Sequence, residues 1–331
     1  FSRGRGVMSV GRVQTPVLKL IVDRYREHIN FDSKPFYEIF LDLNHKNGEF
    51  QVKWFGTKTD RFTDQSEAKK IEDKLKLESQ AVIQSLTQKK VLEKQPLLYD
   101  LTELQKDANK QFKYSADHTL KVMQELYERY KILSYPRTSS RYLSSDIAPK
   151  CPELLNKVSG LTEFSDAINT IKEQNYSIAK RMIDDKKVTD HHAIIPTDKT
   201  PNIGELPTDH KNIYLMVIRR FLSAFLPECE KSHTEIIASA ADESFKATGT
   251  MIIVPGWRQL AQQSEDKKDV LLPTVTQGDP TEIKKVTLKK GQTKAPALYT
   301  EATILAAMET AGKKIDDDEL RQAMKDCGLG T

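Results

Sequence analysis

The chain has little cysteine and no long apolar run. Its 331 residues include three cysteines, Cys151, Cys229 and Cys327, which lie far apart in the sequence. No two of them form a Cys-x-x-Cys pair, so the sequence indicates a reducing compartment and predicts neither a disulfide framework nor a zinc ribbon. The sequence contains no signal peptide and no run of about 18 apolar residues, which predicts a cytoplasmic protein without a membrane partner.

The net charge is small as well. The 51 Lys and Arg residues against 47 Asp and Glu residues leave a formal charge of +4. A nucleic-acid partner therefore cannot be argued from the total charge, only from local clusters. With 38% hydrophobic and 30% charged residues, the composition is that of a globular protein, and the length allows two or three domains.

Residues 133–143, Leu-Ser-Tyr-Pro-Arg-Thr-Ser-Ser-Arg-Tyr-Leu, carry the most chemical information. The chain before them has a helical pattern, and Pro136 favours an extended backbone at Tyr135. Because residues i and i+2 of an extended segment share a face, we expect Tyr135 and Arg137 to point the same way. A fixed cation favours a phenolate and holds a phosphate, so this pair suits covalent attack on a phosphodiester. A packed tyrosine in an ordinary helix-to-loop turn is the competing interpretation.

Two adjacent histidines, His191 and His192, follow Asp190. Adjacent histidines point in different directions and seldom bind one metal, and no cysteine is close in sequence, so zinc is the weaker interpretation. A histidine that donates to a phosphate, with Asp190 orienting it, fits better, and an exposed pair without a function stays open. The acidic run at 316–319 suits the first turn of a helix, so we assign no metal site to this chain.

Strand patterns occur in two separate parts of the chain. In the first, a hairpin turn at Asn47-Gly48 joins two alternating stretches, and a helix capped by Asp64 precedes a strand over 81–92. In the second, strands are expected over 234–240, 245–254, 270–275 and 281–288. The two parts are predicted to complete one sheet, with a helical block inserted between them.

The inserted block, residues 96–230, has helical periodicity. Asp100 and Ser115 are expected to cap two helices joined by about three residues, which is a helix-turn-helix arrangement. Such an arrangement either reads DNA or is a packed helical corner.

Helices are also expected near both ends of the chain. Thr15 and Pro16 are typical of the cap and first residue of one helix, and Thr300 is expected to cap another. The glycine-rich basic stretch with Arg12 before the first helix would suit a phosphate, or it is a plain surface segment.

Six short motifs occur in an order that resembles the type IA DNA topoisomerases, and most of all their bacterial topoisomerase III branch. They are Ser-Val-Gly-Arg-Val-Gln-Thr-Pro at 9–16, Leu-Tyr-Asp-Leu-Thr-Glu-Leu-Gln at 98–105, Ser-Tyr-Pro-Arg-Thr at 134–138, His-His-Ala-Ile-Ile-Pro-Thr at 191–197, residues 293–301, and Gly-Leu-Gly-Thr at 328–331. Each motif is weak alone, but their order and spacing cover nearly the whole chain. The residues alone leave the function open between a DNA-binding helical module and a phosphodiester enzyme, and the resemblance favours the enzyme.

The resemblance implies that Tyr135 is the nucleophile. It would attack a phosphate of single-stranded DNA, form a 5′-phosphotyrosine link and free a 3′-hydroxyl, which later reverses the step without ATP. Arg137 would stabilise charge in the transition state, and His191 would donate to the scissile phosphate. Ser139 stands where the family often has an aspartate, which weakens any role for that position. Contacts with DNA are further expected from Arg12, Gln14, Thr138 and His192.

The resemblance also implies an α+β multidomain fold. A β-rich arch would comprise 31–95 and 231–292, and a helical catalytic domain with a CAP-like helix-turn-helix would comprise 96–230. A helical DNA-groove domain would be split between 1–30 and 293–331. Opening of the arch would let a second strand pass.

The family's N-terminal Toprim domain, which holds Mg²⁺ and a general-acid glutamate, does not occur in this sequence. We therefore expect an internal fragment that binds no metal itself and does not cleave DNA alone. Its expected partner is single-stranded DNA, and the full-length enzyme is expected to be a monomer in the bacterial cytoplasm, associated with the nucleoid.

Overall fold

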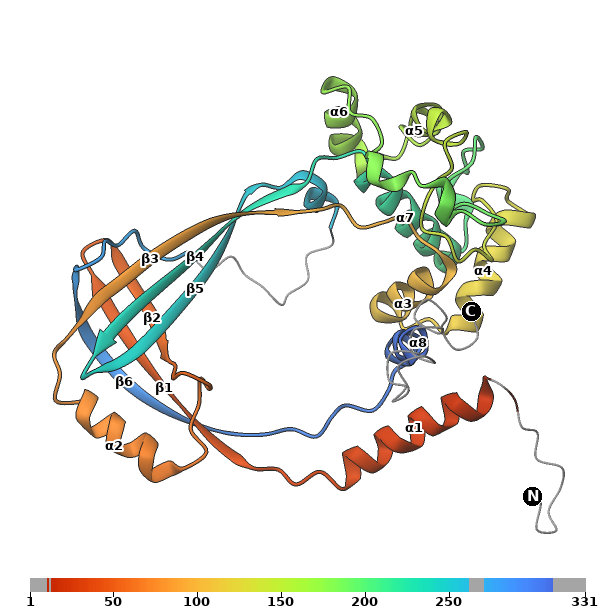
Figure 1. Ribbon diagram of the computed structural model, residues 1–331. Coiled ribbons are helices and arrows are strands. Elements are labelled where there is room, and N and C mark those ends of the chain that lie inside the picture. Colours follow the sequence, from red (N-terminus) through yellow and green to blue (C-terminus); the bar gives the residue numbers. More distant parts are fainter. Residues whose placement is uncertain (1–10, 12, 262–270, 312–331) are drawn as a thin grey trace, which may run out of the picture.

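The structure is a computed structural model that describes residues 11, 13–261 and 271–311. Its elements are arranged as a ring (Figure 1), with a β-barrel on one side and a helical unit on the other. Helices α1 (Gln14–Ile29) and α8 (Glu301–Glu309) complete the lower part of the ring. The fold is therefore α+β, as predicted. In the described part of the chain, no helix is long and apolar enough to cross a membrane.

Six antiparallel strands close into a barrel in the order β1-β2-β5-β4-β3-β6. Three precede the helical unit in sequence and three follow it, so the helical unit interrupts one sheet, as predicted. The hairpin expected at Asn47-Gly48 is confirmed, since His45 pairs with Gly48 there. The strands are β1 (Pro35–His45), β2 (Gly48–Trp54), β3 (Gln80–Glu93), β4 (Cys229–Ala240), β5 (Glu243–Val254) and β6 (Pro280–Gln292).

Alternate side chains of the strands fill the barrel. Ile39, Leu41 and Leu43 of β1 are fully buried, while the residues between them are partly exposed. Helix α2 (Gln65–Leu75) packs against β1 and β6 and adds its own buried side chains to this core. Its predicted cap is confirmed, because Asp64 Oδ1 accepts a hydrogen bond from Ser66 N at 2.7 Å. Burial of each such Ile or Leu side chain contributes about 1.5–3 kcal/mol.

Strands β3, β4 and β5 continue past the barrel as a ribbon that leads to the helical unit (Figure 1). Strand β3 pairs with β6 only over 80–82, but with β4 as far as Glu93. At the far end of the ribbon, Glu93 Oε1 accepts a hydrogen bond from Arg258 at 2.8 Å, and Oε2 of the same carboxylate forms an ion pair with Lys231. These charges hold the ribbon together where it meets the helices.

The ribbon has a register shift near each of its ends. One shift lies between Ile83 and Ser85 of β3, close to the barrel. The other lies between Glu230 and Lys231 of β4, close to the helical unit. An irregularity of this kind locally interrupts the ladder and bends the strand.

The helical unit contains α3 (Leu101–Phe112), α4 (Ala116–Glu128), α5 (Cys151–Lys157), α6 (Ser165–Glu173) and α7 (Thr208–Ser223). The two predicted caps are confirmed: Asp100 Oδ1 accepts from Glu103 N at 2.7 Å, and Ser115 Oγ accepts from His118 N at 3.1 Å. Three residues join α3 to α4, as the helix-turn-helix interpretation requires.

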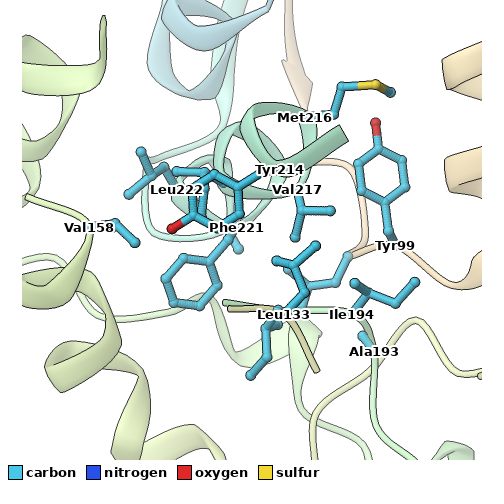
Figure 2. Packing of buried hydrophobic residues seen from close by; sticks show 14 of the residues in the cluster. Tyr99, Leu133, Val158, Ala193, Ile194, Tyr214, Met216, Val217, Phe221 and Leu222 are labelled. Atoms are coloured by element: carbon cyan, nitrogen blue, oxygen red, sulfur yellow. The ribbon is translucent and has the colours of Figure 1, made fainter. Parts of the chain in front are cut away.

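Helix α7 lies over the stretches that hold the candidate catalytic residues. Figure 2 shows Val217 of α7 facing Leu133 and Ile194, and all three are almost fully buried. Nearby, Tyr214 is also fully buried, and its hydroxyl has no hydrogen-bond partner among the residues that the structure describes. Two stretches that lie about 60 residues apart in the sequence therefore share one core.

The predicted start of the first helix was wrong. Helix α1 begins at Gln14, with Val13 as a cap residue that provides no side-chain hydrogen bond. The Thr15 amide already donates to the Gly11 carbonyl at 3.3 Å, so Thr15 lies inside the first turn. Pro16 still fits there, because the first-turn amides have no partner within the helix.

The predicted strand over 270–275 was also wrong. Residues 271–275 form no strand, although Val275 is buried in the barrel core. The Asn47 side chain donates to the Thr274 carbonyl at 2.6 Å, so this segment is held against the hairpin turn by a side chain and not by a ladder. The apolar residues that suggested a strand therefore serve packing instead.

Candidate active site

The stretch with Tyr135 lies directly beside the stretch with the two histidines. Residues 132–138 are called the tyrosine segment below, and residues 191–197 the histidine segment. A β-bridge joins Leu133 to Pro196, and backbone hydrogen bonds flank the bridge on both sides. The apolar residues of both segments are buried in the core of the helical unit, which fixes the two segments relative to each other.

The Tyr135 ring lies between two other aromatic rings. The His191 ring is 4.2 Å away between centroids at an interplanar angle of 38°, and the Tyr127 ring is 5.4 Å away at 84°, an edge-on contact. Tyr127 belongs to the last turn of α4, so the helix positions one wall and the histidine segment the other. Among the described residues, none forms a hydrogen bond with the Tyr135 hydroxyl, which leaves that oxygen available to a ligand.

Two hydroxyl groups on either side of Tyr135 hold the histidine segment. The Ser134 hydroxyl donates to the Ala193 carbonyl at 3.3 Å and accepts from Ile195 N at 3.0 Å. The Thr138 hydroxyl donates to the His191 carbonyl at 2.9 Å. Thr138 was predicted to contact DNA, but its side chain is buried and its hydrogen is committed to this carbonyl. No role was predicted for Ser134, and only its position directly before Tyr135 could have drawn attention to it.

Among the described residues, no hydrogen bond or cation–π contact joins Arg137 to Tyr135. The backbone bends at Pro136, where Thr138 N donates to the Pro136 carbonyl at 3.1 Å, so the segment is not a regular extended strand. The regular extended backbone on which the shared-face expectation for Tyr135 and Arg137 rested is therefore interrupted at Pro136. The Arg137 side chain is exposed, and no ion pair links it to any described residue. Its guanidinium is thus free to meet an anion beside the tyrosine.

The histidines differ in their surroundings. His192 Nδ1 lies 2.7 Å from the Ala193 carbonyl oxygen, and because that oxygen only accepts, Nδ1 carries the hydrogen. His192 also lines a cavity of about 370 Å³, together with Ser134 and Lys150. Asp190 is exposed and forms no hydrogen bond to either histidine in the described structure, so the predicted orienting role is not observed.

A family model described as DNA topoisomerase matches residues 2–331. The chain belongs to the type IA DNA topoisomerase family. The curated relatives include the DNA topoisomerase 3 of Shouchella clausii, which is 37% identical over 331 residues and is matched over 98% of this chain and 45% of the relative. The DNA topoisomerase 3 of Bacillus subtilis is 35% identical over 335 residues, with 98% and 45% covered. The resemblance that the sequence motifs indicated is confirmed.

A solved structure supports the fold of this topoisomerase chain. Full-length topoisomerase I from Thermotoga maritima matches with a TM-score of 0.70 at 20% identity, over 96% of this chain and 51% of that one. The chain thus spans about half the length of the relatives and of the solved structure that it matches.

The remaining predicted DNA contacts lie near the start of the topoisomerase chain. Arg12 is outside the described residues, and Gln14 is the exposed first residue of α1. Helix α1 is held to the segment before α8: Arg24 donates to the Ala297 carbonyl at 3.1 Å and stacks on the Tyr299 ring at 4.5 Å. The two end segments therefore lie together, although no described contact joins Gln14 to Tyr135.

Helix α8 contacts α3 of the helical unit through polar groups. The Lys106 ammonium of α3 lies 3.0 Å from Glu309 of α8 and also pairs with Glu103. The Asn109 side-chain oxygen accepts a hydrogen bond from Ala302 N, at the start of α8, at 3.2 Å. These contacts join the helical unit to α8.

Near these contacts, burial raises the pKa of Asp100 to about 6. The hydrogen bond from Glu103 N and the nearby Arg141 act in the opposite direction, while the Glu103 and Glu309 carboxylates add to the rise in pKa. Asp100 precedes α3, whose first amide, Leu101 N, donates to the Thr138 carbonyl at 3.1 Å. The start of α3 is thus tied directly to the tyrosine segment.

In the described ranges, no three His, Cys, Asp or Glu side chains are grouped so that they could hold a metal ion. The acidic run at 316–319 lies outside these ranges. The zinc interpretation of the histidine pair gains no support from the geometry, since no further ligand-type side chain joins them.

Proposed function

We propose that this chain is the strand-cleaving core of a type IA DNA topoisomerase, with Tyr135 as its nucleophile. The observation that carries the proposal is the geometry of that residue: its ring is fixed between His191 and Tyr127, and its hydroxyl has no partner in the described part of the chain. A rigid ring with a free oxygen at the surface of a packed unit suits attack on an incoming group.

In the proposed reaction, the Tyr135 oxygen attacks a phosphorus atom of single-stranded DNA and gives up its proton. The bond from phosphorus to the 3′-oxygen breaks, and that oxygen leaves as a protonated 3′-hydroxyl. In the reverse step the 3′-hydroxyl attacks the phosphotyrosine and releases Tyr135. One phosphodiester is exchanged for another, so no ATP is consumed.

Three other side chains have proposed roles. The exposed Arg137 guanidinium would bind the phosphate oxygens and stabilise their negative charge in the transition state. The His191 ring, next to the phenol, would donate a hydrogen bond to the same phosphate. Arg12, Gln14 and His192 would contact the strand further along.

The proposal extends to the domains of the whole enzyme. We propose that a Toprim domain supplies the proton for the leaving 3′-oxygen and holds Mg²⁺, which would neutralise phosphate charge when bound. The barrel and its ribbons would serve as the arch, 96–230 as the catalytic domain, and 1–30 with 293–331 as the DNA-groove domain. The whole enzyme would act as a monomer on DNA in the bacterial cytoplasm.

The test is to trap the covalent adduct with the full-length enzyme. Single-stranded DNA labelled at its 3′ end stays attached to the protein if the 5′-phosphate is linked to tyrosine. Tyr135→Phe should form no adduct while binding the strand normally, and Tyr127→Phe, which keeps the neighbouring ring, should still form it. An adduct with Tyr135→Phe would refute the assignment, and a wild-type enzyme that binds without any adduct would favour a non-catalytic helix-turn-helix module.

A further inference from the structure

Two hydroxyl residues enclose the motif Tyr135-Pro136-Arg137, Ser134 before it and Thr138 after it. Both hydroxyls donate to backbone carbonyls of the histidine segment, whereas the Arg137 side chain points to solvent. Thr138 is only 8% exposed. The two hydroxyls therefore act within the protein, at the junction of the two segments that carry the proposed catalytic groups.

The Thr138 hydroxyl has both its hydrogen-bonding functions in use. Its hydrogen goes to the His191 carbonyl at 2.9 Å, because a carbonyl oxygen only accepts. Its oxygen accepts from Ser140 N at 3.0 Å. Through its own carbonyl, Thr138 is anchored to Leu101 N at the start of α3. The side chain therefore connects His191 to a fixed point on a helix.

His191 has few other restraints. Among the described residues, the Thr138 hydroxyl makes the only hydrogen bond to His191, whether to its backbone or to its ring. The next backbone anchor along the histidine segment is Ala193, whose amide donates to the Tyr142 carbonyl at 2.9 Å. The exposed His191 ring is nonetheless 4.2 Å from the Tyr135 ring. Its place there depends on how the backbone is held.

We propose, on the basis of the proposed function above, that Thr138 is a positioning residue for strand cleavage. It holds the His191 carbonyl so that the ring stands beside Tyr135 when a phosphate arrives, and Ser134 holds the same segment from Ala193 onward. A preorganised donor does not have to be immobilised during the reaction, so fixing its backbone raises the rate of the chemical step. Thr138 itself does not touch the substrate.

The experiment uses Thr138→Val and Thr138→Ser in the full-length enzyme. Valine keeps the branched shape but removes the hydroxyl, both as donor to the His191 carbonyl and as acceptor from Ser140 N, whereas serine keeps both functions. We expect Thr138→Val to lower the single-turnover rate of adduct formation about ten- to a hundredfold, with strand binding unchanged, because small displacements of a catalytic group cost rates of this order. Thr138→Ser should restore most of the rate. Thr197→Val is the matched control, since the Thr197 hydroxyl donates to the Lys131 carbonyl at 2.6 Å, at the other end of the same pair of segments.

A double-mutant cycle tests whether the effect passes through His191. In a His191→Ala background, Thr138→Val should have almost no further effect, because the group that it positions is gone. An undiminished effect in that background would overturn the proposal. Loss of strand binding alone, at an unchanged rate per bound strand, would overturn it too and would indicate a direct contact with DNA.

A second measurement does not depend on cleavage. In this chain, the imidazole protons of His191 lie close to the Tyr135 ring, so their NMR shifts should carry a ring-current contribution that Tyr135→Leu removes. Thr138→Val should move the His191 shifts in the same direction, while Thr138→Ser and Thr197→Val should not. Unchanged shifts in a folded Thr138→Val chain would refute the positioning role. An adduct-free wild-type enzyme with the expected shifts would refute the proposed function and leave the positioning of His191 intact.

Discussion

Glu301, the first residue of α8, accepts a hydrogen bond from the backbone amide of Ala116, the first residue of α4, with 2.5 Å between Oε2 and N. Asn109 of α3 does the reverse and accepts from the Ala302 amide of α8. Helix α8 therefore provides an acceptor for the N-terminus of α4, and α3 provides an acceptor for the N-terminus of α8. The free amides and the dipole at a helix N-terminus favour such an acceptor. Because the contact is polar, water replaces these hydrogen bonds at low cost when the two sides separate.

Removal of this acceptor should loosen the contact between α8 and the helical unit. In Glu301→Ala, we expect hydrogen exchange at the Ala116 amide to rise about tenfold or more, since a hydrogen bond to a charged group contributes roughly 1.5–3 kcal/mol. The thermal unfolding of the barrel should not change. Glu27→Ala, which removes an exposed ion pair within α1, is the control. Unchanged exchange at Ala116 would mean that the contact is not formed in solution.

Asp100 should make stability depend on pH. Its pKa is raised to about 6 in the folded protein from roughly 4 in an unfolded chain, so folding disfavours the charged form. The free-energy cost of burying the charged carboxylate is fully present above about pH 6. It is relieved as the pH falls toward about 4, because the folded protein then takes up a proton. Asp100→Asn keeps an acceptor for Glu103 N, and should be more stable than the wild type at about pH 8 by on the order of 2 kcal/mol. The difference should shrink at about pH 4.5, as followed by urea unfolding.

Asp64 is a control in which folding lowers the pKa of the carboxyl group instead of raising it. It also caps a helix, but it is exposed, and the hydrogen bonds from Ser66 hold its pKa below the usual range. Its contribution is stabilising above the unfolded pKa and is lost as the pH falls through the folded value. Asp64→Asn should therefore not gain stability at about pH 8. A gain in both variants would show that the charge of Asp100 is not the cause.

Arg137→Lys should slow cleavage despite the retained charge. An ammonium does not reproduce the planar, two-point hold of a guanidinium on a phosphate, and loss of a preorganised donor of this kind costs about a hundredfold in rate. The measurement is the single-turnover rate of adduct formation by the full-length enzyme. Arg129→Lys, in an exposed arginine at the end of α4, should cleave normally. Equal rates for the two variants would place Arg137 outside the reaction.

This chain alone should bind single-stranded DNA weakly and should not cleave it. Binding should weaken as salt rises, because contacts with phosphates release counterions. Cleavage should require the separately expressed N-terminal domain, which we expect to provide the proton for the leaving oxygen. The purified chain is incubated with labelled DNA and Mg²⁺, with and without that domain. An adduct formed by the chain alone would show that its own residues complete the active site.

Local features of the fold were predictable from the sequence. Asp64, Asp100, Ser115 and Thr300 all cap helices as expected, because a cap is a bond between a side chain and an amide two or three residues away. The predicted cap at Thr15 was wrong because the Thr15 amide already donates a helical hydrogen bond to the Gly11 carbonyl, so the helix begins before Thr15. Such competition between neighbouring start points is not visible in residue preferences.

The site was predictable only in part. The motifs named Tyr135, Arg137 and His191, but His191 lies more than 50 residues from the other two, so the sequence does not show that its ring touches Tyr135. The ring contact between Tyr135 and His191 arises from a β-bridge deep in the helical core, and the bend at Pro136 interrupts the extended backbone that the sequence predicts before Arg137. The hydrogen bond from the Thr138 hydroxyl to the His191 carbonyl joins residues that are 53 apart, so no local sequence pattern predicts it.

The ribbon of β3, β4 and β5 has a mechanical consequence. Between its two register shifts it is continuously hydrogen-bonded over about seven residues of β4, from Lys231 to Ile237, or roughly 23 Å at the usual rise per residue. Its joints lie at Ser85 and Lys231, where the ladder is already interrupted and bending breaks the fewest hydrogen bonds. A rotation of about 10° at the barrel end would move the far end by roughly 4 Å over this length. We therefore expect the barrel to be the pivot about which the ribbon carries the helical unit with Tyr135.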